Sequence, residues 1–302
     1  MEPTVMKKIY LLLLLLSLSL LAKDSRSTLN DLVQSAFKTA SEKRGVIAMA
    51  AHNKMLSQKI AKDIVMIVNG IDVEEHRKDL IHAKQSFNDF LLAMYVGDDK
   101  RHITKSTDPE ILAELDEVKE EWTHFCRAIL KFYKKENKID QEAYHYIMDN
   151  NEKLLRLSHK LTQTLKSKNQ LNMNFNRVME HTLKIADRQK MLTQKMFKEK
   201  FLIHIGEDVK RNSIRLRGSI ILFKNGLNGL LYGDTKRGLA KVTNLKIQQK
   251  LQKMWDLYKE VEGFYIQKEI NKEEMKRLSV IEKELLQYAT EVVSMIENTL
   301  EY

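Results

Sequence analysis

Apolar residues recur three and four positions apart along almost the whole chain, which is the spacing of an amphipathic α-helix. The first long stripe shows this spacing clearly, although a few polar residues interrupt its apolar face. The stripe consists of Ile47, Ala50, Ala51, Lys54, Ser57 with Gln58, Ala61, Val65 and Val68. Gly70 follows it, and because glycine commonly ends a helix, we expect a first helix over about residues 28–69.

Glycine and proline also mark the limits of the next elements. Gly97 predicts the end of a second helix over about residues 73–96. Thr107-Asp108-Pro109 is typical of a helix start, because proline is tolerated in the first turn, and it predicts a third helix. A turn near Asn137-Lys138 then precedes a fourth. The first part of the chain is therefore expected to form four helices.

The same pattern occurs again 136 residues further along the chain. The aligned pairs are Lys54-Met55-Leu56-Ser57-Gln58-Lys59 with Lys190-Met191-Leu192-Thr193-Gln194-Lys195, Lys62 with Lys198, Gly70 with Gly206, and Gly97 with Gly233. After a shift of three, Trp122 aligns with Trp255. Matches that hold over so many residues predict a tandem duplication, with modules over residues 23–165 and 166–302 after an N-terminal segment, 1–22.

The duplication predicts two four-helix bundles. In the second, Gly206, Gly233 and a turn near Asn271 would separate the helices. No proline or glycine lies between about Asp140 and Ile205. The last helix of the first module is therefore expected to continue into the first helix of the second as one rod, about 100 Å long at 1.5 Å per residue. Two bundles placed side by side are the alternative.

Composition supports an all-α fold. The 302 residues include only 2 prolines, and 43% of them are hydrophobic. A β-sandwich or a nucleotide-binding α/β fold would need more turn residues, and the glycines form no G-x-G-x-x-G or Walker pattern. Disorder is excluded by the regular apolar spacing. The lone Cys126 cannot form a disulfide within the chain, so packing must hold the helices together.

The N-terminus predicts export. Lys7 and Lys8 precede an apolar run from Ile9 to Ala22, which is shorter than the roughly 20 residues that span a bilayer. This pattern is typical of a secretory signal peptide over residues 1–22, with an uncleaved membrane anchor as the alternative. We therefore expect a periplasmic protein. For such a protein the net charge of +10 favours an anionic small molecule, an envelope surface or an acidic partner over nucleic acid.

Two lysines on the apolar stripe are the main candidate chemistry. Lys54 and its counterpart Lys190 each have a hydroxyl residue three positions later and a glutamine four positions later. A lysine on a core stripe must either extend to water or find an anion, because burying it unpaired is unfavourable. We therefore expect a small-ligand or anion site, with solvated lysines as the alternative. The candidate ligand-binding residues are Lys54, Ser57, Gln58, Arg188, Lys190, Thr193 and Gln194.

These residues resemble a known family. Ala186-Asp187-Arg188-Gln189-Lys190-Met191-Leu192-Thr193-Gln194-Lys195, its counterpart at 50–59, and Leu227-x-x-Leu230-x-x-Gly233 are similar to the motifs of the PilJ-type N-terminal domain. That domain is the sensor of type IV pilus methyl-accepting chemotaxis transducers, and it is related to the periplasmic sensor of nitrate/nitrite histidine kinases. The resemblance extends to both modules.

The resemblance implies a non-enzymatic, exported sensor without a cofactor or metal. It would bind a small anionic or polar ligand and signal through a separate membrane protein, such as a kinase, cyclase or chemoreceptor. The central arginine of the family motif is lysine at 54 and 190. A compact ammonium therefore replaces a guanidinium, which can bind an anion through two parallel hydrogen bonds. Nitrate is therefore one candidate among several ligands. The chain is expected to be a monomer or a homodimer, since the duplication can supply two-fold pairing within one chain.

Two other functions fit parts of the sequence. A helical scaffold for envelope partners would need no ligand at all. A di-iron bundle oxidase would use Glu121-x-x-His124 and Glu142-x-x-His145, which flank the turn near 137. The helices before these motifs provide few glutamates to complete such a site, so the oxidase is the weakest of the three hypotheses.

Overall fold

The computed structural model describes residues 42–43, 45–101, 103–132, 140–168 and 177–299. The expected signal peptide and the turn near Asn137-Lys138 lie outside these residues. A helix over residues 45–68, called helix 45–68 below, comes first. The long helices that follow are α2 (Val73–Val96), α3 (Pro109–Leu130), α4 (Gln141–Lys168), α5 (Arg177–His204), α6 (Val209–Tyr232), α7 (Leu245–Ile266) and α8 (Lys272–Thr299). Within the described ranges there is no strand, which confirms the all-α prediction.

Local sequence signals set the helix limits as predicted. Gly70, with φ at +72°, follows helix 45–68, and glycine adopts this left-handed conformation without a steric penalty. At the start of α3, the Asp108 side chain accepts hydrogen bonds from the backbone of Glu110 and Ile111, at 2.9 and 3.2 Å. These bonds satisfy two amides that have no partner inside the helix.

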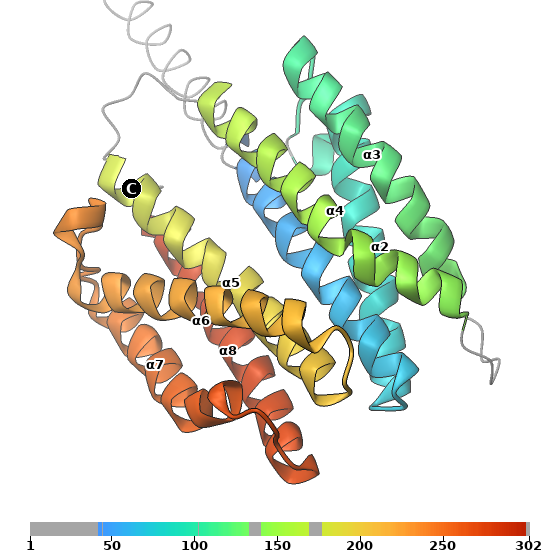
Figure 1. Ribbon diagram of the computed structural model, residues 1–302. Helices are drawn as coiled ribbons and strands as arrows, with labels where there is room; N and C mark the ends of the chain where they lie inside the picture. The colour runs from blue at the N-terminus through green and yellow to red at the C-terminus, as the bar shows by residue number, and fades with distance from the viewer. Residues whose placement is uncertain (1–41, 44, 102, 133–139, 169–176, 300–302) are drawn as a thin grey trace, which may run out of the picture.

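The helix limits recur at a regular interval. Helices α2 and α6 begin and end 136 residues apart, and so do α3 and α7. Both α4 and α8 contain 28 residues. Figure 1 shows the two sets of helices as neighbouring groups. Below, the first half means residues 42–168 and the second half means residues 177–299.

The shift that aligned Trp122 with Trp255 is wrong. Trp122 stacks on Phe87 with ring centroids 4.0 Å apart, and 136 residues later Tyr258 packs on Phe223 at 5.2 Å. Tyr258 therefore holds the place of Trp122 in the second half without a shift, and Trp255 is only partly buried beside it.

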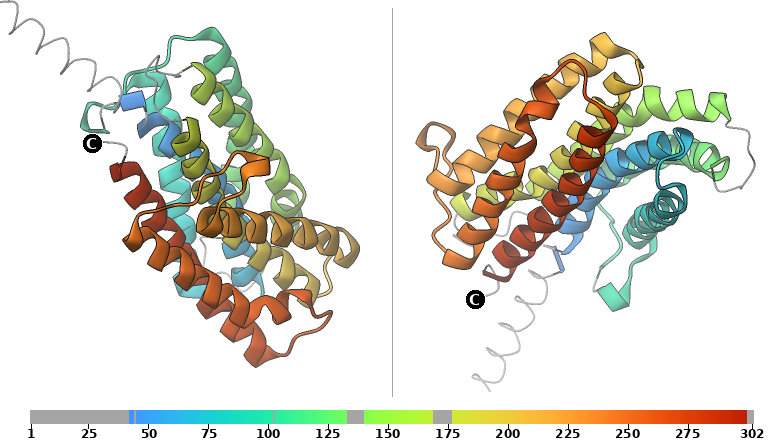
Figure 2. Two further views of the ribbon diagram at one scale, coloured as in Figure 1. Left: turned by 90° about the vertical axis from the view of Figure 1, so that its left-hand side faces the viewer. Right: turned by 90° about the horizontal axis from the view of Figure 1, so that it is seen from below.

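The continuous rod from about 140 to 205 is also wrong. The Lys198 ammonium donates a hydrogen bond to the Asn151 side-chain oxygen over 2.6 Å. In one straight helix these residues would be roughly 70 Å apart at 1.5 Å per residue. Helices α4 and α5 instead lie beside each other, so the arrangement follows the alternative of two groups placed side by side (Figure 2).

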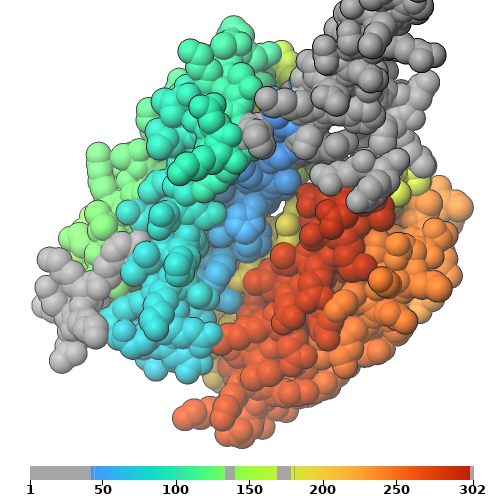
Figure 3. Space-filling view, turned by 180° about the vertical axis from the view of Figure 1, so that it is seen from behind, coloured from blue at the N-terminus to red at the C-terminus, as the bar shows by residue number. Residues whose placement is uncertain are grey.

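Helix 45–68 and α5 lie at the centre of the molecule. Helix α5 packs on α6 and α8, α7 packs on α8, and α3 packs on α4. Seen from behind, residues of helix 45–68 lie between α2 and α8 (Figure 3). The first helix of each half therefore contacts the other half. None of the described helices has an apolar stretch long enough to cross a membrane.

Candidate functional site

The two candidate lysines meet at one carboxylate. Asp187 on α5 lies 2.8 Å from the Lys190 ammonium and 3.7 Å from that of Lys54. Burial alone would raise the pKa of Asp187, but Lys190 and Lys54 outweigh burial and hold this pKa below its usual range. Burial lowers the pKa of Lys54 to about 8, although Asp187 opposes this change. An internal anion thus neutralises part of the charge that the stripe brings together.

More positive charge surrounds this contact than the sequence indicated. Lys166 on α4, together with Lys184 and Lys190 on α5, lowers the pKa of Lys54 electrostatically. Burial and the charges of Lys54, Lys184, Lys166 and Arg188 lower the pKa of His159. These residues come from different helices, so a periodic stripe on one helix could not reveal them. In the sequence, the basic residues of α4, such as Lys166, were the signal that could have pointed to this positive charge.

Arg188 is half-buried at the edge of this positive region. Burial lowers the pKa of its guanidinium, and Arg237 adds to the shift. The Arg188 Nε atom has no hydrogen-bond partner within the described parts of the chain. Of the candidate residues, Arg188 therefore retains an unused donor.

The two hydroxyl residues of the motif point back to their own helices. Ser57 donates to the backbone oxygen of Lys54, and Thr193 donates to that of Lys190, both over 2.8 Å. Both side chains are fully buried. Their hydroxyls therefore fix the local helix geometry and do not reach a shared site.

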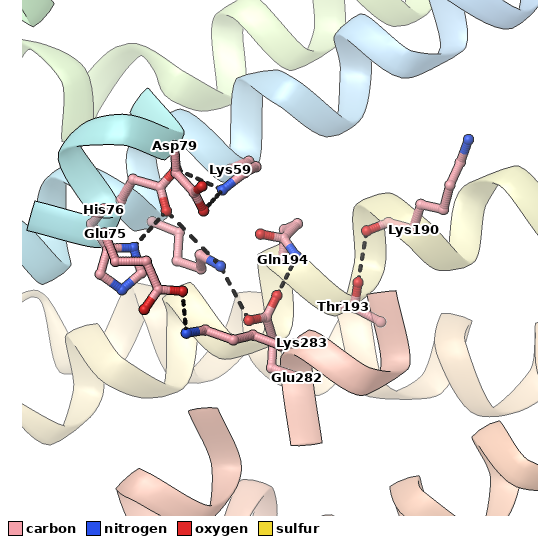
Figure 4. A network of polar contacts seen from close by, with 11 residues as sticks. Lys59, Glu75, His76, Asp79, Lys190, Thr193, Gln194, Glu282 and Lys283 are labelled. Atoms are coloured by element: carbon pink, nitrogen blue, oxygen red, sulfur yellow. Dashed lines mark hydrogen bonds and ion pairs between the residues drawn. The ribbon is translucent and has the colours of Figure 1, made fainter. Parts of the chain in front are cut away.

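The two motif glutamines belong to a buried network that connects the halves. Gln58 accepts a hydrogen bond from Lys198 at 2.7 Å, and Gln194 donates to the Glu282 carboxylate. Glu282 also pairs with Lys62 at 3.1 Å (Figure 4). Sequence reasoning missed Lys62, Lys198 and Glu282 as polar partners, because their contacts depend on which helices lie together.

A cavity of about 260 Å³ opens beside Lys190. Helix 45–68, α2 and α8 form its walls, and α5 contributes Lys190 alone to its lining. The lining residues are Ala48, Met49, His52, Asn53, Ser86, Phe90, Lys190, Thr290, Val293, Ser294 and Glu297. Burial and the charge of Lys190 lower the pKa of His52 to about 4, so His52 is neutral at pH 7. The Asn53 side-chain nitrogen is buried without a partner among the described residues.

A further polar cluster lies between helix 45–68 and α2. His76 contacts the buried Asp63 carboxylate at 2.8 Å, and Lys59 pairs with both Asp63 and Asp79, at 2.9 and 2.5 Å (Figure 4). The potential ligand atoms of Asp63, His76 and Asp79 lie within 4.8 Å of one another, which is close enough for a metal ion. However, the Lys59 ammonium already pairs with both carboxylates and Lys62 lies 4.0 Å from Asp63, so two cations face the two anions of this cluster.

The proposed di-iron residues do not come together. Glu121 accepts a hydrogen bond from Tyr146 at 2.7 Å and pairs with Lys153. His124 and His145 are exposed to solvent. In the described ranges these residues form no group at metal-ligand distances.

One comparison connects this geometry with a known family. Residues 36–145 match the family model of the N-terminal domain of type IV pili methyl-accepting chemotaxis transducers, PilJ. The match covers roughly a third of the chain, and it includes Lys54, Ser57 and Gln58. The comparison with curated proteins gives no match. Residues 36–145 are therefore similar to the N-terminal domain of these chemotaxis transducers, which is a family of sensory signalling proteins.

Proposed function

We propose that this protein is a non-enzymatic periplasmic sensor that binds a small anionic or polar ligand where helix 45–68 meets α5. The observation that carries the proposal is the meeting of Lys54 and Lys190 at Asp187, with Lys166 and Lys184 close enough to act on Lys54. The lysines that act on Lys54 and Asp187 outnumber the one carboxylate, which favours an anion because positive potential attracts negative ligands. The export signal over residues 1–22 would deliver the protein to the periplasm.

The second half is proposed to be a second PilJ-type module. Support comes from helix limits that recur 136 residues later and from the repeated Lys-Met-Leu-[Ser/Thr]-Gln motif. Two modules in one chain would supply internally the pairing of first helices that separate chains obtain by dimerising.

Signalling would require a change in how helix 45–68 packs on α5. A bound anion competes with Asp187 for the lysines, which weakens one contact between these two helices. Small helix shifts of about 1–2 Å are a common form of such switching. A separate membrane protein, such as a kinase, cyclase or chemoreceptor, would detect the shift.

A thermal-shift screen of the full chain tests this proposal. The panel contains nitrate, nitrite, other oxyanions, carboxylates and amino acids. A ligand at 100 times its Kd stabilises the folded state by about 2.7 kcal/mol, which raises the melting temperature measurably. Lys54→Ala and Lys190→Ala are expected to reduce the shift, whereas Lys236→Ala in an exposed loop should leave it unchanged. Unchanged affinity in both stripe variants would contradict the site assignment.

One observation favours a scaffold function as the second candidate. Asp187 already pairs with both stripe lysines, so the contact between the halves is held together without a ligand. A scaffold would show no ligand-dependent change in melting temperature. It would instead co-purify with a specific envelope protein under conditions in which the PilJ-type domain remains folded.

A further inference from the structure

We propose that the cavity beside Lys190 is the ligand pocket and that it takes a small carboxylate with an apolar body. This inference rests on the proposed sensory function and gives it a location and a ligand class. A cavity of about 150 Å³ can bind benzene, so 260 Å³ is large enough for a small organic molecule. The pocket therefore fits a molecule larger than an inorganic oxyanion.

Lys190 and Asn53 are the buried donors among the polar residues of this pocket, which also include His52, Ser86, Thr290, Ser294 and Glu297. Lys190 is 7% exposed and Asn53 is 2% exposed, and both line the cavity. The Asn53 side-chain nitrogen has no hydrogen-bond partner within the described ranges. This nitrogen is closed off from solvent, so the Asn53 side chain would have to rotate for a ligand acceptor to relieve the unfavourable buried donor. A carboxylate has two oxygens and can accept hydrogen bonds from both residues at once.

The rest of the lining is mixed, and its apolar part sets the other end of the ligand. Met49, Phe90 and Val293 line the cavity with apolar surface. Apolar walls combined with a few polar groups are typical of small-molecule sites. An aliphatic chain or aromatic ring attached to the carboxylate would cover this surface, which nitrate or sulfate cannot do.

The corresponding place in the second half carries different side chains. Counting 136 residues onward, Gln189 replaces Asn53 and Gly226 replaces Phe90. A Cβ atom at position 226 would overlap the Gln189 Nε2 atom, so the Gln189 side chain lies directly over Gly226. Its Nε2 donates to the Ile185 backbone oxygen over 3.1 Å. The longer glutamine thus lies over Gly226 and uses its Nε2 donor, although its Oε1 has no partner, whereas the Asn53 donor has no partner within the described ranges.

The pocket is coupled to the contact between the halves through Lys190. The Lys190 ammonium pairs with Asp187 at 2.8 Å, and Asp187 also contacts Lys54. A ligand carboxylate that pairs with Lys190 therefore competes with Asp187. Occupation of the pocket would weaken the attachment of α5 to helix 45–68.

Calorimetric titration of the full chain with acetate, butyrate, hexanoate and benzoate tests this inference, with nitrate and sulfate as inorganic probes. Affinity should rise from acetate to hexanoate or benzoate as apolar surface is covered. Asn53→Gln, which adds a methylene group toward the cavity, and Lys190→Gln should each weaken binding by about tenfold or more. The matched variant Gln189→Asn changes the counterpart position and should leave carboxylate affinity unchanged.

The outcomes separate this inference from the proposed function. Carboxylate binding that Asn53→Gln weakens and Gln189→Asn does not would support both. Binding of nitrate or sulfate that depends on Lys54 but is insensitive to Asn53→Gln would overturn the pocket and leave the sensor intact. Carboxylate binding that neither Asn53→Gln nor Lys190→Gln changes would also overturn the pocket. No binding by any probe would overturn the pocket and count against the sensor.

Discussion

Lys62 on helix 45–68 and Lys198 on α5 are separated by the 136-residue interval, and both are buried, yet they are neutralised differently. Lys62 pairs with the Glu282 carboxylate at 3.1 Å. Lys198, which is 1% exposed, donates to the amide oxygens of Gln58 and Asn151, at 2.7 and 2.6 Å, and lies 3.7 Å from Glu152. Burial lowers the pKa of Lys198 to about 8.

The difference lies in the partner helices. Asn151 is the eleventh residue of α4, and Glu282 is the eleventh residue of α8. The same backbone position therefore presents an amide in one half and a carboxylate in the other. Similar packing does not fix the electrostatics of a buried lysine, because a single side chain on the facing helix decides them.

The largest expected effect follows from removing the carboxylate of this pair. Glu282→Ala leaves the Lys62 ammonium and the Gln194 amide without their buried partner. Such a loss should lower the free energy of unfolding by about 3–5 kcal/mol, measured by urea denaturation. The adjacent Lys283 pairs with Glu75 at 2.6 Å on the surface and provides the control, because exposed pairs contribute about 0–1 kcal/mol. Equal effects of Glu282→Ala and Lys283→Ala would contradict this account.

A smaller effect should distinguish the two lysines themselves. Lys62→Met leaves a charged carboxylate buried, whereas Lys198→Met leaves mainly neutral amide oxygens unpaired and removes a buried charge. We expect Lys198→Met to cost about 1–3 kcal/mol, which is less than Lys62→Met. Chemical denaturation of both variants checks the order, and the reverse order would show that Glu152 neutralises Lys198 as fully as Glu282 neutralises Lys62.

The smallest expected effect is a dependence on pH. A lysine in the unfolded chain titrates near 10.4, whereas Lys198 titrates near 8 in the folded state. Between about pH 8 and pH 10.4 the unfolded chain binds more protons at this lysine than the folded chain does. Lys198 therefore makes the free energy of unfolding rise with pH, by up to about 1.4 kcal/mol per pH unit. The wild type should therefore gain stability relative to Lys198→Met between pH 8 and pH 9. A constant difference in unfolding free energy across this range would refute the lowered pKa.

Much of the fold could be predicted from single residues. Gly97 and Pro109 placed the limits of α2 and α3, because glycine and proline act through local backbone geometry. The rod from about 140 to 205 failed for the opposite reason. An absence of helix breakers permits a continuous helix but does not require one, and contacts such as Lys198 with Asn151 hold α4 beside α5.

The candidate site could be predicted only in part. Helical spacing placed Lys54 and Lys190 on core stripes, and the structure brings both to Asp187. The cavity could not be predicted, because Asn53 and Phe90 come together with Lys190 only through packing of separate helices. The counterpart at Gln189 and Gly226 likewise depends on a contact between helices.

The most direct test of the sensor is the distance between helix 45–68 and α5 with and without ligand. Spin labels at the exposed residues Asn69 and His204, in a Cys126→Ser background, report this distance by pulsed electron resonance. The account predicts that a saturating ligand from the screen shifts the mean distance by about 1–2 Å, and that Lys190→Ala abolishes the shift. An unchanged distance distribution at full ligand occupancy would contradict signalling through these two helices.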